Sequence, residues 1–135
     1  MIAGRGLRRP AIVAALCAIV MAAAGPRMHR LTESDSGREL SVAVGDAIEI
    51  ALPENPGTGY RWIVKAGGEP CLSLESERFE RGAAVPGRGG VHRWTFKVIA
   101  AGSAAIEMNY LRPWEKNVPP ARSFMIKLHA GGSAV

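Results

Sequence analysis

The chain has 135 residues, 47% of them hydrophobic and 6% aromatic, with two cysteines and a formal net charge of +5. This length suits a single domain built around one hydrophobic core. The charged residues are spread singly, which argues against the basic stripe of a nucleic-acid-binding protein and against a polybasic membrane patch.

The first 24 residues have the order of a secretory signal peptide. Three arginines, Arg5, Arg8 and Arg9, precede an apolar run over residues 11–24 that ends in small side chains. This run is shorter than the roughly 20 residues of a membrane-spanning helix, so cleavage after about Ala24 is favoured over a permanent anchor. We therefore expect a periplasmic or secreted protein with no stable membrane anchor.

Loss of the signal peptide changes the charge and the cysteine count. It leaves 14 basic and 12 acidic side chains, a net charge of +2, and it removes Cys17. Cys71 then stays alone, so no intramolecular disulfide is possible and the core must stabilise the fold unaided. Cys71 follows Pro70 at a strand start, where we interpret it as a half-buried small residue, with intermolecular pairing as the alternative. We expect a monomer.

Residues 25–39 are polar and show no clear period. They are interpreted as a mobile lead-in, or alternatively as a ragged edge strand. Order is expected to begin near Leu40, so the folded domain is predicted over residues 40–135.

From Leu40 onward, apolar and polar residues alternate in short runs, which is the period of a half-buried β-strand. The clearest run places Trp94, Phe96 and Val98 on one face. The expected strands cover residues 40–44, 47–52, 60–65, 71–76, 92–98, 104–110 and 124–128, and residues 77–81 are a charged candidate edge strand. This spacing, with no convincing amphipathic helix, predicts an all-β fold, an immunoglobulin-like antiparallel β-sandwich of about seven to eight strands.

Three segments rich in glycine or proline interrupt these strands and form the candidate site. The first loop consists of Asn55, Pro56, Gly57, Thr58, Gly59 and Tyr60, the second of Gly87, Arg88, Gly89 and Gly90, and the third begins with Arg112, Pro113 and Trp114. If adjacent strands are antiparallel, all three loops lie at one end of the sandwich, as the loops of an antibody variable domain do. We therefore expect a binding protein that presents three loops to one partner.

Each loop also has a simpler interpretation. Proline fixes one backbone angle and glycine permits positive φ, so the first loop is either a plain turn or a stiff, preorganised binding element. The second loop is either a flexible connector or a site of close backbone approach, and it lacks the helix and lysine of a phosphate-binding loop. Trp114 is either a plug over the end of the core or an exposed interface anchor.

The order and spacing of the three loops resemble one family, the chagasin-type inhibitors of papain-like cysteine proteases. These proteins carry an Asn-Pro-Thr-Thr-Gly-aromatic loop, a Gly-x-Gly-Gly loop and an Arg-Pro-Trp/Phe loop on an immunoglobulin-like sandwich. The resemblance covers roughly residues 40–130. Gly57 departs from the pattern, because it stands where the family has its first threonine, while Thr58 retains the second. We expect Gly57 to weaken or retune the contact rather than abolish it.

The resemblance implies reversible, competitive inhibition of papain-like, cathepsin L-type cysteine proteases, without a cofactor or metal. It implies that the first loop enters the protease cleft with Thr58 closest to the catalytic Cys-His pair. Tyr60 is expected to support the shape of this loop.

The resemblance assigns the other two loops to the walls of the cleft. Gly89 and Gly90 would let the backbone approach one wall. Trp114 would pack on the other wall, with Arg112 and Pro113 orienting it.

Two alternatives come from other functional classes. An enzyme would need a nucleophile or metal site built from Cys71, the carboxylates and the histidines, but His29, His92 and His129 show no ligand spacing. We therefore expect no enzymatic activity. An envelope adhesion or structural module would present the same loops to another partner, and a protease-inhibition assay separates it from an inhibitor.

Overall fold

The computed structural model describes residues 25–82 and 89–132. The expected signal peptide, residues 1–24, lies outside the described residues, as do Gly87 and Arg88 of the second loop. Within the described ranges, no helix has the length and apolar character needed to cross a bilayer.

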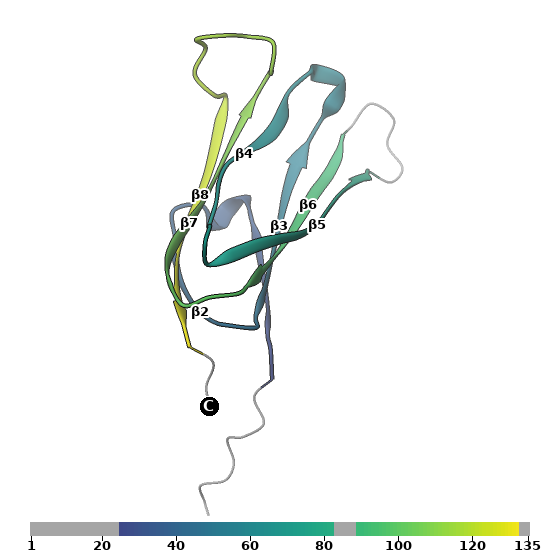
Figure 1. Ribbon diagram of the computed structural model, residues 1–135. Coiled ribbons are helices and arrows are strands. Elements are labelled where there is room, and N and C mark those ends of the chain that lie inside the picture. Colours follow the sequence, from purple (N-terminus) through teal and green to yellow (C-terminus); the bar gives the residue numbers. More distant parts are fainter. Residues whose placement is uncertain (1–24, 83–88, 133–135) are drawn as a thin grey trace, which may run out of the picture.

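The described chain forms eight strands in two four-stranded sheets (Figure 1). Sheet one has the order β1-β3-β6-β5 and sheet two the order β2-β8-β7-β4. The elements are β1 (Met28–Thr32), the 3-10 turn η2 (Glu33–Asp35), β2 (Glu39–Ala43), β3 (Ala47–Glu54), the 3-10 turn η3 (Pro56–Thr58), β4 (Arg61–Gly67), β5 (Leu72–Arg81), β6 (Gly90–Val98), β7 (Gly102–Leu111) and β8 (Arg122–Gly131). The predicted all-β sandwich is therefore confirmed.

The alternating side chains of the strands form the core between the sheets. In sheet one, Ile50 of β3 lies opposite Trp94 of β6, and in sheet two Met108 of β7 lies opposite Phe124 of β8. These four side chains are completely or almost completely buried. Each contributes about 1.5–3 kcal/mol through removal of apolar surface from water, so this core is a principal source of the stability of the sandwich.

The structure corrects the expectation for residues 25–39. Order begins well before Leu40, because β1 pairs in parallel with β3 and places Leu31 opposite Ile50. Leu31 is only 4% exposed, so one apolar side chain anchors this edge strand to the core. The edge-strand alternative is therefore the correct one, and the mobile lead-in is wrong.

Two strand pairs differ from the predicted antiparallel arrangement. Both β1–β3 and β2–β8 are parallel, and in both cases the N-terminal strand lies at the edge of its sheet. The expected run 71–76 and the charged piece 77–81 form one strand, β5, at the other edge of sheet one. Cys71 precedes β5 and is fully buried rather than half-buried.

The strand directions place the loops of interest at one end of the molecule. The β3–β4 and β7–β8 connections lie at the same end as the last residues of β5 and the first residues of β6 (Figure 1). The start of β1 and the end of β8 lie at the opposite end (Figure 1). We call the first end the loop pole.

Candidate functional site

The first loop is a short, internally bonded turn. Pro56 opens η3, and the side-chain oxygen of Asn55 accepts a hydrogen bond from the N–H of Gly57 at 3.2 Å, which caps the turn. Gly59 ends it with φ of +84°, a left-handed conformation that suits glycine. These features favour the stiff binding element over a plain turn, because the loop holds one shape through its own hydrogen bonds.

Thr58 uses its side chain inside the loop. Its hydroxyl donates to the carbonyl oxygen of Asn55 at 2.7 Å and lies 3.3 Å from the N–H of Tyr60, from which it accepts. Thr58 is nevertheless exposed at the surface of the loop pole. The residue therefore shapes the first loop as well as being presented by it.

Aromatic side chains support the first loop from the sandwich below. Tyr60 stacks on Tyr110 of β7 with ring centroids 5.3 Å apart, and Tyr110 also packs against Trp62 at 4.9 Å. The hydroxyl of Tyr110 accepts a hydrogen bond from the N–H of Asn55 at 3.2 Å. Tyr60 thus has the expected supporting role, whereas Tyr110 is a support that sequence reasoning missed, because it resembles an ordinary core residue.

The described part of the second loop packs against the first. A side-chain carbon on Gly89 would overlap the carbonyl oxygen of Glu54 and lie 2.7 Å from the Cα of Asn55. One on Gly90 would overlap the backbone of Glu80 on β5. Both glycines are therefore required by contacts within this protein, a reason that differs from the expected approach to a partner's wall.

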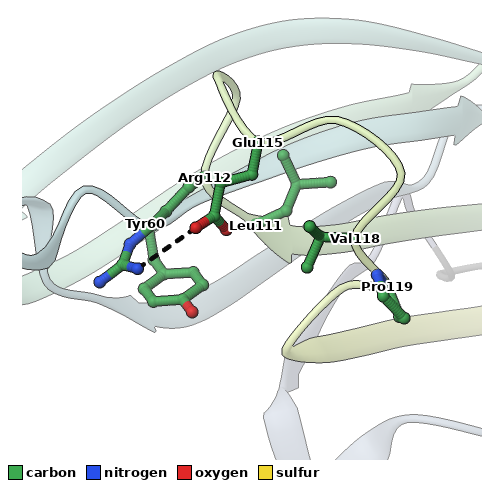
Figure 2. A pocket seen from close by; sticks show the side chains of 6 residues that line it. All are labelled: Tyr60, Leu111, Arg112, Glu115, Val118 and Pro119. Atoms are coloured by element: carbon green, nitrogen blue, oxygen red, sulfur yellow. Dashed lines mark hydrogen bonds and ion pairs between the residues drawn. The ribbon is translucent and has the colours of Figure 1, made fainter.

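The third loop contacts the first through Arg112. Its Nε donates to the carbonyl oxygen of Thr58 at 3.1 Å, and its guanidinium lies 4.4 Å from the centre of the Tyr60 ring. Glu115 holds the same guanidinium at 3.5 Å (Figure 2). Arg112 therefore braces two loops against each other.

Trp114 is an exposed side chain that packs against the first loop. It is 65% exposed, and its ring would overlap a side-chain carbon on Gly59. The structure thus shows the exposed alternative rather than a plug over the core. The absence of a side chain at Gly59 makes room for the indole.

A small cleft lies between Tyr60 of the first loop and the residues of the third loop. The small cleft in Figure 2 has a volume of about 10 Å³, room for roughly one water molecule. It is lined by Tyr60, Leu111, Arg112, Glu115, Val118 and Pro119. This cleft is far smaller than the roughly 300–1,000 Å³ of a typical ligand pocket, so it does not enclose a small ligand.

The candidate enzyme residues do not converge. His29 pairs with Asp46 at 2.9 Å and His129 lies 3.9 Å from Glu39, whereas His92 pairs with carboxylates near the loop pole. Cys71 is buried in the β4–β5 connection, far along the strands from the loop pole. Among residues 25–82 and 89–132, no three His, Cys, Asp or Glu side chains are placed to share a metal ion.

Comparison with known proteins supports the resemblance. The model of the chagasin family peptidase inhibitors, I42, matches residues 41–128. Chagasin of Trypanosoma cruzi is 34% identical over 107 residues, which cover 76% of this chain and 97% of chagasin. Amoebiasin-2 of Entamoeba histolytica is 32% identical over 112 residues, covering 82% of this chain and 88% of that protein.

Solved structures give the same result. A crystal structure of a cysteine protease inhibitor from Entamoeba histolytica matches with a TM-score of 0.69 and 30% identity, covering 78% of this chain and 96% of the inhibitor. The solution structure of amebosin matches with a TM-score of 0.62 and 31% identity, covering 79% of this chain and all of amebosin. This chain belongs to the chagasin family of peptidase inhibitors.

Proposed function

We propose that this protein is a reversible, competitive inhibitor of papain-like cysteine peptidases and that it occludes the active-site cleft with its three loops. Membership of an inhibitor family supports this function and argues against the enzyme alternative. The observation that carries the proposal is the mutual bracing of the loops. Gly89 packs on Asn55, Arg112 bonds to Thr58, and Trp114 rests on Gly59.

The first loop is the element that enters the cleft. Its hydrogen-bonded turn loses little conformational entropy on docking, which favours affinity. In this proposal the tip around Thr58 lies beside the catalytic cysteine and histidine of the peptidase. The block is steric, so inhibition is reversible and substrate competes with it.

The second and third loops contact the two walls of the cleft. Trp114 supplies the principal contact on one side, because large exposed aromatic side chains are frequent binding hot spots. Gly87, Arg88, Gly89 and Gly90 form the contact on the other side. The absence of a side chain at Gly89 lets this end of the second loop pack against Asn55, so the two loops enter together.

Titration of active papain with the purified chain tests the proposed function. We expect a saturable loss of activity that excess substrate relieves, with one inhibitor bound per peptidase. A serine peptidase assayed in parallel is the control and should keep its activity. Full papain activity at a large excess of the chain would refute the proposal and favour the envelope adhesion module.

We further propose a periplasmic or secreted monomer, released from the membrane by cleavage after about Ala24. The basic, apolar and small-residue order of residues 1–24 supports this location. N-terminal sequencing of the protein from its native cell should begin near Gly25. An intact N-terminus in the membrane fraction would instead show a retained anchor.

A further inference from the structure

A buried carboxylate closes the base of the first loop. Glu54 is the last residue of β3 and is only 6% exposed. Its Oε2 accepts a hydrogen bond from the N–H of Trp62, the second residue of β4, at 2.9 Å. Because β3 and β4 belong to different sheets, this one side chain joins the two ends of the loop across the sandwich.

The inner faces of β3 and β6 end in a polar pair below the loop. Glu54 lies on the same face of β3 as the buried residues Ile50 and Leu52. His92 lies on the same face of β6 as the buried Trp94. The Nδ1 of His92 lies 2.6 Å from Oε1 of Glu54. A polar pair therefore lies between the buried apolar residues of β3 and β6 and the base of the first loop.

A second carboxylate holds the other nitrogen of the ring. The Nε2 of His92 lies 2.8 Å from Oε2 of Glu77 on β5. The ring also stacks on Trp94 at 3.9 Å and meets the edge of Phe79. In the part of the chain that the structure describes, the ion pairs formed by Glu54 and Glu77 involve His92 alone.

These two distances define which form of the ring fits the site. A neutral imidazole has one N–H and one lone pair, so it donates to one carboxylate and turns a lone pair toward the other. The doubly protonated ring donates to both, through charge-assisted hydrogen bonds. The arrangement places one carboxylate oxygen within hydrogen-bond distance of each nitrogen of the His92 ring.

We propose that Glu54 and His92 are positioning residues for the first loop and that inhibition is tightened by the second proton on His92. The inference rests on the proposed function. When the ring gives up that proton, one N–H remains; it stays with the buried Glu54, because Glu77 is half exposed and can turn to water. That N–H no longer carries a positive charge, so the buried carboxylate loses its counter-charge, Glu54 is held less firmly and its bond to Trp62 weakens. The first loop then loses the shape that makes its docking favourable.

The pH profile of inhibition separates this role from general stability. Papain is titrated from about pH 5 to about pH 8 with the wild-type chain and with His92→Gln, and the ratio of inhibition constants cancels the pH response of papain itself. We expect wild type to be about tenfold tighter at the acid end, the value of one charge-assisted hydrogen bond, and the ratio to approach one at the alkaline end. A ratio that does not change with pH would overturn the proposal.

His29→Gln is the matched control. His29 also pairs with a buried carboxylate, Asp46, at 2.9 Å, but this pair lies at the end of the sandwich opposite the loop pole. Its pH profile of inhibition should follow wild type. If His29→Gln changes the profile as His92→Gln does, the effect belongs to overall stability and the proposal fails.

Two variants of Glu54 test its carboxylate. Glu54→Gln keeps a carbonyl that accepts from Trp62, so it should inhibit within about threefold of wild type at neutral pH while losing the pH-dependent part. Glu54→Ala removes the acceptor and should weaken inhibition at every pH. A Glu54→Ala variant that matches wild type throughout would overturn the proposal.

Nuclear magnetic resonance of the free wild-type chain provides a measurement that needs no variant and no peptidase. Both ring nitrogens of His92 should carry protons at the acid end, and hydrogen exchange at the Trp62 amide should accelerate when one proton leaves. Titration of the ring without any change at Trp62 would contradict the coupling. Failure of wild type to inhibit papain at any pH would instead refute the proposed function, whatever the ring does.

Discussion

At the scale of single residues, Trp114 and Thr58 have different positions on the loop pole. Trp114 makes few demands on the fold, since most of its surface faces solvent and its ring rests on Gly59. Thr58 has its hydroxyl engaged with Asn55 and Tyr60. Substitution should therefore separate a residue that contacts the partner from one that also maintains the loop.

Trp114→Ala should weaken inhibition of papain by about 2 kcal/mol or more, roughly 30-fold in the inhibition constant, with little change in melting temperature. The reason is that the exposed indole contributes surface to a partner rather than to the core. Ile99→Ala is the matched control, because Ile99 is 52% exposed at the opposite end and should leave inhibition unchanged. A Trp114→Ala variant that mainly loses stability would place the indole in the fold instead.

Thr58→Ala should weaken inhibition by about 1 kcal/mol, because it removes the hydroxyl that donates to Asn55 and accepts from Tyr60. Thr58→Ser retains this hydroxyl and should recover most of the inhibition. An unchanged inhibition constant for Thr58→Ala would show that the turn holds its shape without this bond and that Thr58 does not contribute to binding.

At the scale of elements, two loop glycines have opposite surroundings. A side chain at Gly89 meets the backbone of the first loop, which has no way to yield, whereas one at Gly57 meets only the side-chain oxygen of Asn55, at 3.4 Å. The structure therefore has no room for a side chain at Gly89 but accepts one at Gly57. The comparison tests whether the loops must pack together to act.

Gly89→Ala should lower the unfolding free energy by about 1–3 kcal/mol and weaken inhibition, because overpacking pushes the second loop away from the first. Gly57→Thr, which restores the residue expected of the family, should keep the melting temperature of wild type. Thermal unfolding and papain titration of both variants give the two comparisons. Equal behaviour of the two variants would contradict the packing described here.

The turn between β2 and β3 provides a further test at the scale of elements, through pH. Burial alone would raise the pKa of Asp46, but hydrogen bonds from His29 and from the N–H groups of Arg27 and Ala43 outweigh it, so its pKa lies below the ordinary 3.8. A carboxyl whose pKa is lowered in the folded state stabilises the fold at every pH above its ordinary pKa. This contribution is lost as the pH falls through the folded-state pKa.

Asp46→Asn should therefore cost about 2 kcal/mol of unfolding free energy at neutral pH and flatten the loss of stability below about pH 4. Urea unfolding of wild type and variant at a series of pH values measures both. Parallel pH profiles for the two proteins would show that Asp46 is not a source of the acid sensitivity.

At the scale of the whole molecule, the predictable parts were those with a local signal. Strict alternation around Trp94 and Phe124 predicted strands, and glycine and proline predicted the loops between them. The edge strand β1 could be expected only as an alternative to a mobile segment, because Leu31 is its only buried residue and no alternation marks it. Its parallel pairing with β3 depends on contacts that a linear pattern does not contain.

The three loop motifs of the candidate site could be predicted from the sequence, but the contacts that join the loops to one another could not. The contacts of Arg112 with Thr58 and of His92 with Glu54 join residues that lie 54 and 38 positions apart. A signal for the second contact does exist in the sequence. Glu54 and His92 are polar residues at inward positions of two strongly alternating strands, and such positions indicate a buried polar pair.

The central claim concerns the whole loop pole, and a crystal structure of the chain bound to papain tests it most directly. We predict that the first loop fills the active-site cleft with Thr58 beside the catalytic cysteine, while Gly89 and Trp114 lie against opposite walls. A complex in which papain contacts a sheet edge or the opposite pole and leaves its cysteine uncovered would contradict this account.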